Sequence, residues 1–147
     1  PNETTTRGMI VTMLHRLEDT PSAISSGFTD VAAGAWYADA VAWAAANGVV
    51  NGISDSSFAP ETAITREQLA TILYRYAQLK GYDVSVSGDL SRYADASQIS
   101  EYAITAMQWA NENDLITGNT ATTLNPQGNA TRAEVATILM RFIENMG

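Results

Sequence analysis

A threonine followed by an arginine stands three times at the start of an apolar helical pattern, at residues 6–7, 65–66 and 131–132. The threonine is a favourable N-cap for a helix. The arginine is locally unfavourable, because its positive charge opposes the positive end of the helix dipole. Three copies of an unfavourable residue indicate that Arg7, Arg66 and Arg132 each serve a contact.

Two kinds of contact explain these arginines. A guanidinium beside free helix amides forms a compact site for a carboxylate or a phosphate. A salt bridge to an acidic residue of a neighbouring segment, such as Asp30 or Asp95, is the structural alternative. The residues favour neither interpretation over the other.

The threonines also have a purely structural role. Gln68 and Glu134 stand three positions after Thr65 and Thr131, where a capping box requires them. The first copy has Met9 at that place, so it is expected to keep the cap and lose the box.

The aromatic residues divide by their place in the pattern. Trp36 stands at the expected start of a helix after a loop, where its ring is equally suited to sugar stacking and to packing. Trp43 and Trp109 lie in the middle of expected helices, which favours core packing. The single histidine, His15, is interpreted as a packed helix residue.

No catalytic set emerges from the sequence. There is no cysteine, and the acidic residues do not follow the spacing of a calcium loop. A glycine-rich phosphate loop, a nucleophile elbow and a zinc-protease motif are also missing. The sequence therefore predicts a non-enzymatic protein with no metal ligands and no cofactor.

The net charge of −8 argues against nucleic acid and against anionic membrane surfaces as partners. No apolar run is long enough to span a bilayer, so membrane insertion is not expected. An anionic ligand would need local arginines to hold it.

The chain is built from repeats. Arg132 lies 66 positions after Arg66, and the same offset relates Trp109 to Trp43. Arg66 lies 59 positions after Arg7, so Pro1 falls on Pro60 and the first repeat is expected to be incomplete. The face left open by its missing half would be covered by another chain or remain exposed, which suggests a homo-oligomer through this repeat.

The hydrophobic spacing predicts an almost entirely α-helical chain. Its helices are expected at about 7–18, from 36 to a stop at Gly48, from 66 to a stop at Gly81, at about 101–113, where Asp114 replaces the glycine, and at about 132–146. The order is one helix followed by two helix-loop-helix units, which is typical of a stacked repeat array.

The repeated segments resemble the S-layer homology (SLH) repeats of bacterial cell-surface proteins. The resemblance rests on residues 28–31, 36–37, 40–41, 48–52, 58–60 and 64–67, and on their copies at 93–95, 118, 124–126 and 131–134. It divides the chain into the second half of a truncated first repeat (1–27), a second repeat (28–81), a linker (82–91) and a third repeat (92–147).

This resemblance implies a pseudo-threefold bundle of helices that is extracellular, at the bacterial cell surface. Such modules bind secondary cell-wall polysaccharide non-covalently, often through a pyruvylated sugar, in grooves between adjacent repeats. The positions that would contact the ligand are Arg7, Arg66, Arg132, Trp36, Asp30 and Asp95.

Some residues depart from the family pattern. Glu101 stands opposite Trp36 and removes a stacking ring from the third repeat. Gly8-Met9 and Glu67-Gln68 replace the usual Ala-Glu after the arginine. We expect the groove led by Arg66 to be the best preserved.

The sequence thus predicts a module that tethers an exported protein to the bacterial wall. The alternative is a structural or protein–protein module without glycan binding, in which the arginines form salt bridges between repeats.

Overall fold

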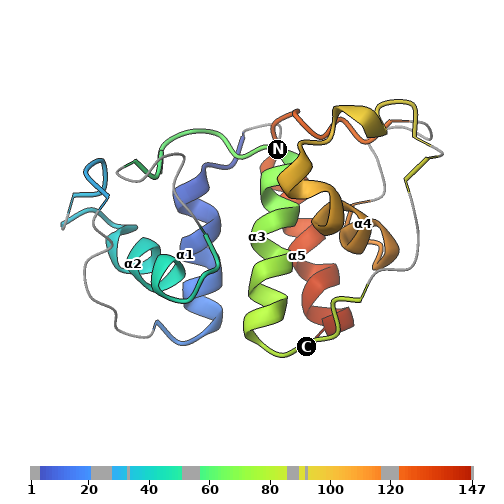
Figure 1. Cartoon of the computed structure of the whole chain (residues 1–147). Coiled ribbons are helices and arrows are strands. Elements are labelled where there is room, and N and C mark those ends of the chain that lie inside the picture. The colour runs from blue at the N-terminus through green and yellow to red at the C-terminus, as the bar shows by residue number, and fades with distance from the viewer. Residues whose placement is uncertain are drawn as a thin grey trace. The chain divides into compact units, whose positions relative to one another are not determined.

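The computed structural model describes residues 4–20, 28–32, 34–50, 57–85, 90–91, 93–116 and 123–146. Within these ranges the chain is helical and contains no β-strand, so the all-α class is confirmed (Figure 1). Gly52 and Gly118 of the repeat motif, and part of the predicted linker, lie outside the described residues. The pseudo-threefold packing of the repeats stays a prediction.

The helices begin close to the predicted positions. The α-helices are α1 (Arg7–Leu17), α2 (Ala38–Ala46), α3 (Arg66–Leu79), α4 (Ile104–Glu112) and α5 (Arg132–Met146), and two 3₁₀ turns, η1 (Ala96–Gln98) and η2 (Glu101–Ala103), precede α4. The helices expected from 36 and 101 thus start as turns, and their α-helical parts begin at Ala38 and Ile104.

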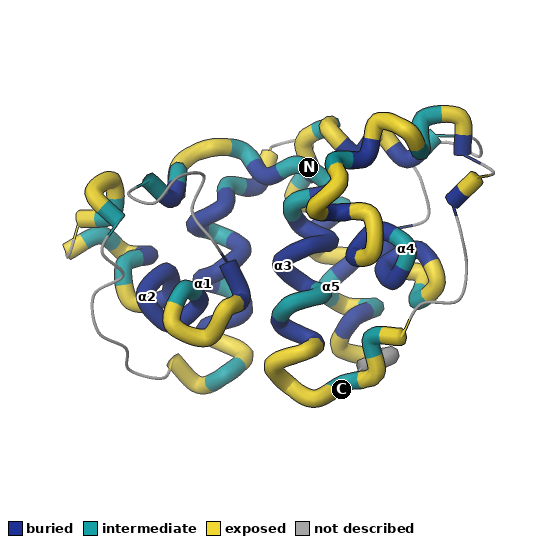
Figure 2. Tube along the Cα trace, viewed as in Figure 1, coloured by how far each residue is buried: buried dark blue, intermediate teal, exposed yellow. Residues whose placement is uncertain are grey.

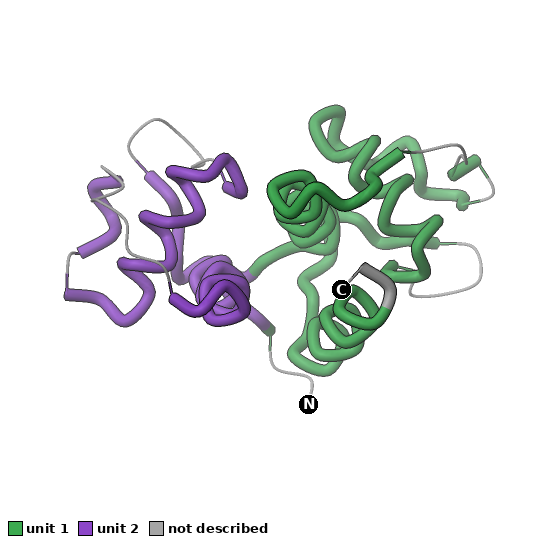
Figure 3. The backbone as a smooth tube through the Cα atoms, turned by 90° about the horizontal axis from the view of Figure 1, so that it is seen from below, with its two compact units in different colours: residues 1–4, 64–147 green, residues 5–63 purple. Residues whose placement is uncertain are grey.

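The chain forms two compact units (Figure 3). Unit 2 comprises residues 5–63 and unit 1 comprises residues 1–4 and 64–147. In unit 2, α1 packs on α2, and the sides of the helices that face each other are buried (Figure 2). The buried residues there include Ile10, Leu14, Val41, Trp43 and Phe58.

Unit 1 repeats this helix pair and adds a third helix. Helix α3 packs on α4 as α1 does on α2. Tyr74 meets the ring of Trp109 edge-on at 5.7 Å, and Phe142 of α5 lies 6.2 Å from Trp109. Trp43 and Trp109 are both buried, as predicted. His15 is buried too, with its ring 5.6 Å from that of Trp43.

Helix ends follow the sequence signals with one exception. Gly48, Gly81 and Asp114 have positive φ angles of 72°, 76° and 60°, the left-handed exits expected at these positions. The prediction that α1 lacks a capping box is wrong. The N–H of Thr6 donates to the Met9 sulfur at 3.4 Å, because the flexible thioether can reach back as a weak acceptor.

Each capping threonine also forms an isolated antiparallel β-bridge. Thr6 pairs with Ala63, Thr65 with Asn129, and Thr131 with Thr4. In each case the partner lies two residues before a capping threonine of another copy. The three bridges therefore follow the same pairing rule.

Candidate functional site

The first amides of α1 and α3 are already used by the protein. The N–H groups of Arg7 and Gly8 donate to the carbonyls of Thr62 and Pro60 at 3.0 and 2.9 Å. In α3, the N–H groups of Arg66 and Glu67 donate to Gly128 and Pro126, both at 3.0 Å. The expectation of an anion held by free amides beside Arg7 or Arg66 is therefore wrong. The loop before the next capping threonine supplies carbonyls that satisfy these donors.

Asp30 and Asp95 clamp these same loops. The two carboxylate oxygens of Asp30 accept the N–H groups of Phe58 and Ala59 at 2.9 and 2.8 Å. Asp95 holds Leu124 and Asn125 in the same way at 2.9 and 2.7 Å. Ala59 and Asn125 both have left-handed φ angles, 61° and 51°. The clamp therefore fixes a strained left-handed residue in the loop, and it does so in both copies.

The clamps lower the pKa of both carboxyl groups. For Asp30, the N–H of Phe58 is the largest cause, and the charge of Arg7 adds to it. For Asp95, burial raises the pKa, but the N–H groups of Leu124 and Asn125 outweigh it. Both carboxylates are thus charged at neutral pH, and each of their oxygens accepts a backbone N–H.

The side chain of Arg7 points into the interior of unit 2, to which Arg7 belongs. Its side chain is buried, with the residue 6% exposed. Its Nε donates to the carbonyl of Phe58 at 3.0 Å, and its guanidinium carbon lies 4.8 Å from the centre of the Phe58 ring. Arg7 and Asp30 thus support one loop from two sides.

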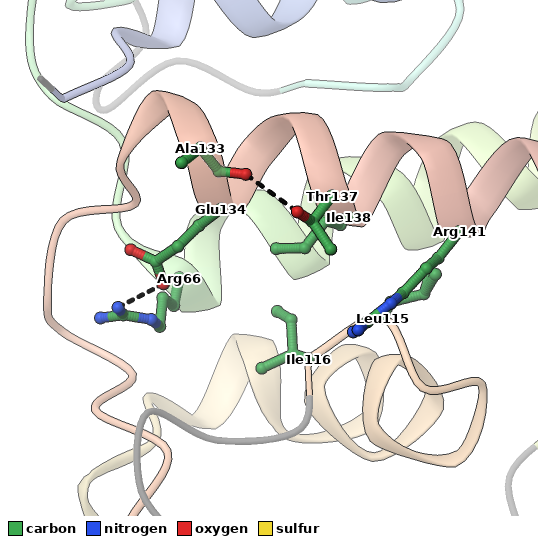
Figure 4. A pocket seen from close by; sticks show the side chains of 8 residues that line it. All are labelled: Arg66, Leu115, Ile116, Ala133, Glu134, Thr137, Ile138 and Arg141. Carbon is green, nitrogen blue, oxygen red and sulfur yellow. Dashed lines mark hydrogen bonds and ion pairs between the residues drawn. The ribbon is translucent and has the colours of Figure 1, made fainter. Parts of the chain in front are cut away.

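Arg66 differs from Arg7, because it lines a pocket. Its guanidinium forms an ion pair with Glu134 of α5, and the two lie together at one end of a cavity of about 290 Å³ (Figure 4). Arg141 lies at the other end, and its Nη1 donates to the carbonyl of Asp114 at 3.1 Å. The wall between them is mostly apolar and is formed by Leu115, Ile116, Ala133, Thr137 and Ile138.

Glu134 has two partners. Its Oε1 accepts the N–H of Thr131 at 3.1 Å, which closes the capping box of α5, and its Oε2 pairs with Arg66. Burial raises the pKa of Glu134, but the Thr131 amide and Arg66 together bring it below its ordinary value. Glu134 is therefore an internal carboxylate bound to the cation of the pocket.

Gly128 leaves room for the Arg66 guanidinium. A Cβ on Gly128 would lie 2.7 Å from Nη1 of Arg66 and 2.2 Å from Nδ2 of Asn125. The carbonyl of Gly128 also accepts the N–H of Arg66. The loop and the arginine are thus fitted to each other.

The other predicted site residues lie elsewhere. Arg132 is exposed on α5. Trp36 is 62% exposed and lines a second pocket, in unit 2. Trp36 and Arg66 belong to different units.

Sequence reasoning missed three residues of this region. Glu134 was predicted as a capping residue, and Arg141 was given no role. Glu67, 4% exposed, accepts the N–H and hydroxyl groups of Ser100 at 2.9 and 2.5 Å. The sequence offered two signals: Glu67 and Glu134 are acidic where the first copy has Gly8 and Met9, and Arg141 recurs as Arg75 and Arg16.

Two features are absent from the described ranges. No group of three or more histidine, cysteine or acidic side chains is placed to hold a metal ion. No helix there has the length and apolar character needed to cross a membrane.

Comparison with known proteins gives one family. The model of the S-layer homology domain matches residues 27–70 and 92–136. The chain is 36% identical to the surface-layer 125 kDa protein of Lysinibacillus sphaericus over 99% of its own length and 12% of that protein. It is 32% identical to exoglucanase XynX of Acetivibrio thermocellus, over 98% of the chain and 13% of the enzyme. A cellulosome-anchoring protein of that organism is 33% identical over 67% of the chain and 22% of its own length. The chain thus spans less than a quarter of each of these relatives.

Proposed function

Because the chain belongs to the S-layer homology domain family, we propose that it anchors a longer exported protein to the bacterial cell wall by binding an anionic secondary wall polysaccharide. Relatives named as surface-layer and cellulosome-anchoring proteins support a location at the cell surface. The glucanase relative supports a non-catalytic role, because the matching segment is a small part of that enzyme. The anchoring role needs no catalytic group.

The observation that carries the proposal is the pocket that Arg66 lines. With a net charge of −8, the chain needs local cations to hold an anion. Arg66 and Arg141 supply two positive charges at the ends of one mostly apolar cavity. A pyruvate ketal on a sugar has a carboxylate and a methyl group, which fit a cation and an apolar wall such as Ile116.

The remaining predicted contact residues take other roles in this proposal. Arg7, Asp30 and Asp95 hold the loops that pack on the helix starts. Arg132 is exposed at the start of α5, outside the Arg66 pocket. Self-association through the first repeat is not part of the proposal, because neither the relatives nor the described contacts point to it.

One observation favours the alternative function. Arg66 is engaged with Glu134, as expected for a structural salt bridge between repeats. In a protein–protein module this pair would only connect α3 to α5. In an anchor, the ligand carboxylate must compete with Glu134 for Arg66.

Co-sedimentation with Lysinibacillus sphaericus wall sacculi tests the proposal, before and after the secondary polymer is stripped. Wild type should sediment only with unstripped walls. Arg66→Ala should lose most binding, whereas Arg75→Ala, which removes the same charge from α3 outside the pocket, should retain it. Equal binding by Arg66→Ala would exclude the pocket as the site. An unbound wild type would favour the structural module.

A further inference from the structure

Helix α5 has an exposed apolar face. Met140 is 55% exposed and Ile143 is 48% exposed, and Ala136, one turn before Met140, is exposed as well. Residues three and four positions apart lie side by side on a helix. Ala136, Met140 and Ile143 therefore form one stripe, which we call the α5 stripe. It shares no residue with the side of α5 that lines the Arg66 pocket.

The other two copies of this helix bury the matching positions. Ala136 aligns with Ala70 of α3 and with Val11 of α1, and both of these residues are 0% exposed. Ile143 aligns with Ala77 of α3, which is also 0% exposed. The repeat thus places an apolar face toward a neighbouring element in α1 and α3, and leaves the same face open in α5.

The centre of the stripe identifies what covers this face elsewhere. Met140 aligns with His15 of α1 and Tyr74 of α3. The His15 ring lies 5.6 Å from that of Trp43 in α2, and the Tyr74 ring lies 5.7 Å from that of Trp109 in α4. Helix α2 packs on α1 and α4 packs on α3 (Figure 1). A methionine at the third such position suits the same neighbour, because a thioether makes favourable contacts with aromatic rings. The element that fits the α5 stripe is therefore a helix with a tryptophan at the matching place.

The β-bridges indicate which part of a polypeptide supplies this helix. Ala63 pairs with the capping threonine of α1, and the chain that leads into Ala63 contains α2, the helix that packs on α1. Asn129 pairs with the capping threonine of α3, and the chain that leads into Asn129 contains α4, the helix that packs on α3. At the start of α5 the bridge joins Thr131 to Thr4. By the same rule, the helix for α5 belongs to the polypeptide that leads into Thr4.

We propose that the α5 stripe is the docking surface for an amphipathic helix that precedes Pro1 in the longer exported protein. A tryptophan of that helix packs on Met140, and its apolar side covers Ala136 and Ile143. The proposal rests on the proposed function only in taking this chain as part of a longer protein, and the chain spans less than a quarter of each relative named above. It does not depend on which ligand the Arg66 pocket binds.

An extended chain tests this docking. Residues 28–59, which contain α2, are placed directly ahead of Pro1, because Pro1 aligns with Pro60 and the register of the repeat is then kept. Nuclear magnetic resonance should show that the methyl signal of Met140 moves in the extended chain, since a nearby indole ring changes its resonance. The methyl signal of Met107, which is buried, serves as the internal reference. The melting temperature should rise by at least about 4 °C. Trp43→Ala in the added copy alone should remove most of both effects.

A substitution in the stripe adds a matched comparison. Met140→Lys should leave the melting temperature of the original chain nearly unchanged, because this side chain is more than half exposed. In the extended chain the same substitution should remove most of the gain. Leu17→Lys changes an exposed apolar residue of α1, 44% exposed, and should leave the gain intact. Equal melting temperatures of the original and extended chains overturn the proposal, as does a gain that Met140→Lys does not reduce.

Sedimentation velocity separates the proposed helix from a helix of a second copy. The original chain should sediment as a monomer. A dimer that Met140→Lys dissociates would show that a second copy covers the stripe, and it would overturn the proposal. Wall co-sedimentation reports on the anchoring function independently. If the extended chain gains stability through Met140 but does not sediment with walls, the anchoring function fails and the docking surface stands.

Discussion

Glu134 pairs with Arg66 from a neighbouring helix while its second oxygen closes the capping box of its own helix. The same carboxylate is therefore a structural cap and a counter-ion inside the pocket. Because both partners lower its pKa, it is ionised at neutral pH. Any anionic ligand that uses Arg66 meets an internal competitor.

Glu134→Gln should therefore tighten the binding of an anionic wall polymer. Glutamine keeps the cap, as Gln68 does for Thr65, but it no longer neutralises Arg66. We expect roughly twofold to fivefold higher affinity, since a partly exposed ion pair contributes up to about 1 kcal/mol. Binding isotherms on soluble polymer measure this, with Gln68→Glu as the matched control. Weaker binding by Glu134→Gln would mean that Glu134 positions Arg66 for its ligand.

Gly128 gives a second way to perturb Arg66 without removing its charge. Gly128→Ala would place a Cβ within 2.7 Å of the Arg66 guanidinium. That distance, and the 2.2 Å to Nδ2 of Asn125, are shorter than van der Waals contact, so both side chains must move. We expect wall binding to fall about as far as in Arg66→Ala, with a loss of roughly 1 kcal/mol in stability.

Gly34→Ala is the control for this substitution. A Cβ on Gly34 meets no atom within 4 Å. Its wall binding and melting temperature should stay close to those of wild type. Normal wall binding by Gly128→Ala would show that the guanidinium can relocate without consequence for the ligand.

The sequence predicted the helices because their signals are local. The capping threonines and the left-handed residues at Gly48, Gly81 and Asp114 act within a few residues of the helix end that they define. The repeat offset identified equivalent positions, including the clamp residues Asp30 and Asp95. The offset did not show whether these carboxylates contact a ligand or hold a loop, since either role explains an acidic residue at a fixed place.

The missed features depend on segments far apart in the chain. Arg66 and Glu134 are 68 residues apart, and Glu67 and Ser100 are 33 apart. The loop carbonyls of Pro126 and Gly128 occupy amides that looked free in the sequence. Hydrogen bonds of this kind follow from how the helices pack, which no local pattern specifies.

The lowered pKa values of the two clamp carboxyl groups predict that the fold loses stability in acid. Asp30 and Asp95 have folded-state pKa values below the ordinary 3.8. Above pH 3.8 the carboxylates are ionised in both states and their stabilisation is present in full. It is lost as the pH falls below that value through the folded-state pKa. The free energy of unfolding should therefore decrease in strong acid.

Urea unfolding from about pH 7 to about pH 2 measures this slope. The double variant Asp30→Asn, Asp95→Asn should be less stable at neutral pH, and its stability should depend less on pH. Asp39→Asn changes a carboxylate for which no hydrogen bond appears in the described ranges, so it should follow the wild-type profile. A double variant with the wild-type pH slope would show that other acidic groups cause the acid sensitivity.

Glu67 connects the start of α3 to the turns that precede α4. Its buried carboxylate accepts the N–H and hydroxyl of Ser100, and the Tyr102 hydroxyl lies 3.3 Å away. Glu67→Ala leaves the Ser100 amide without this acceptor and opens a void, so we expect a loss of about 2–4 kcal/mol in unfolding free energy. Glu67→Gln keeps an oxygen for the amide and should lose less than half as much. Chemical denaturation measures both, and similar losses would show that the charge, and not the hydrogen bond to Ser100, stabilises this corner of unit 1.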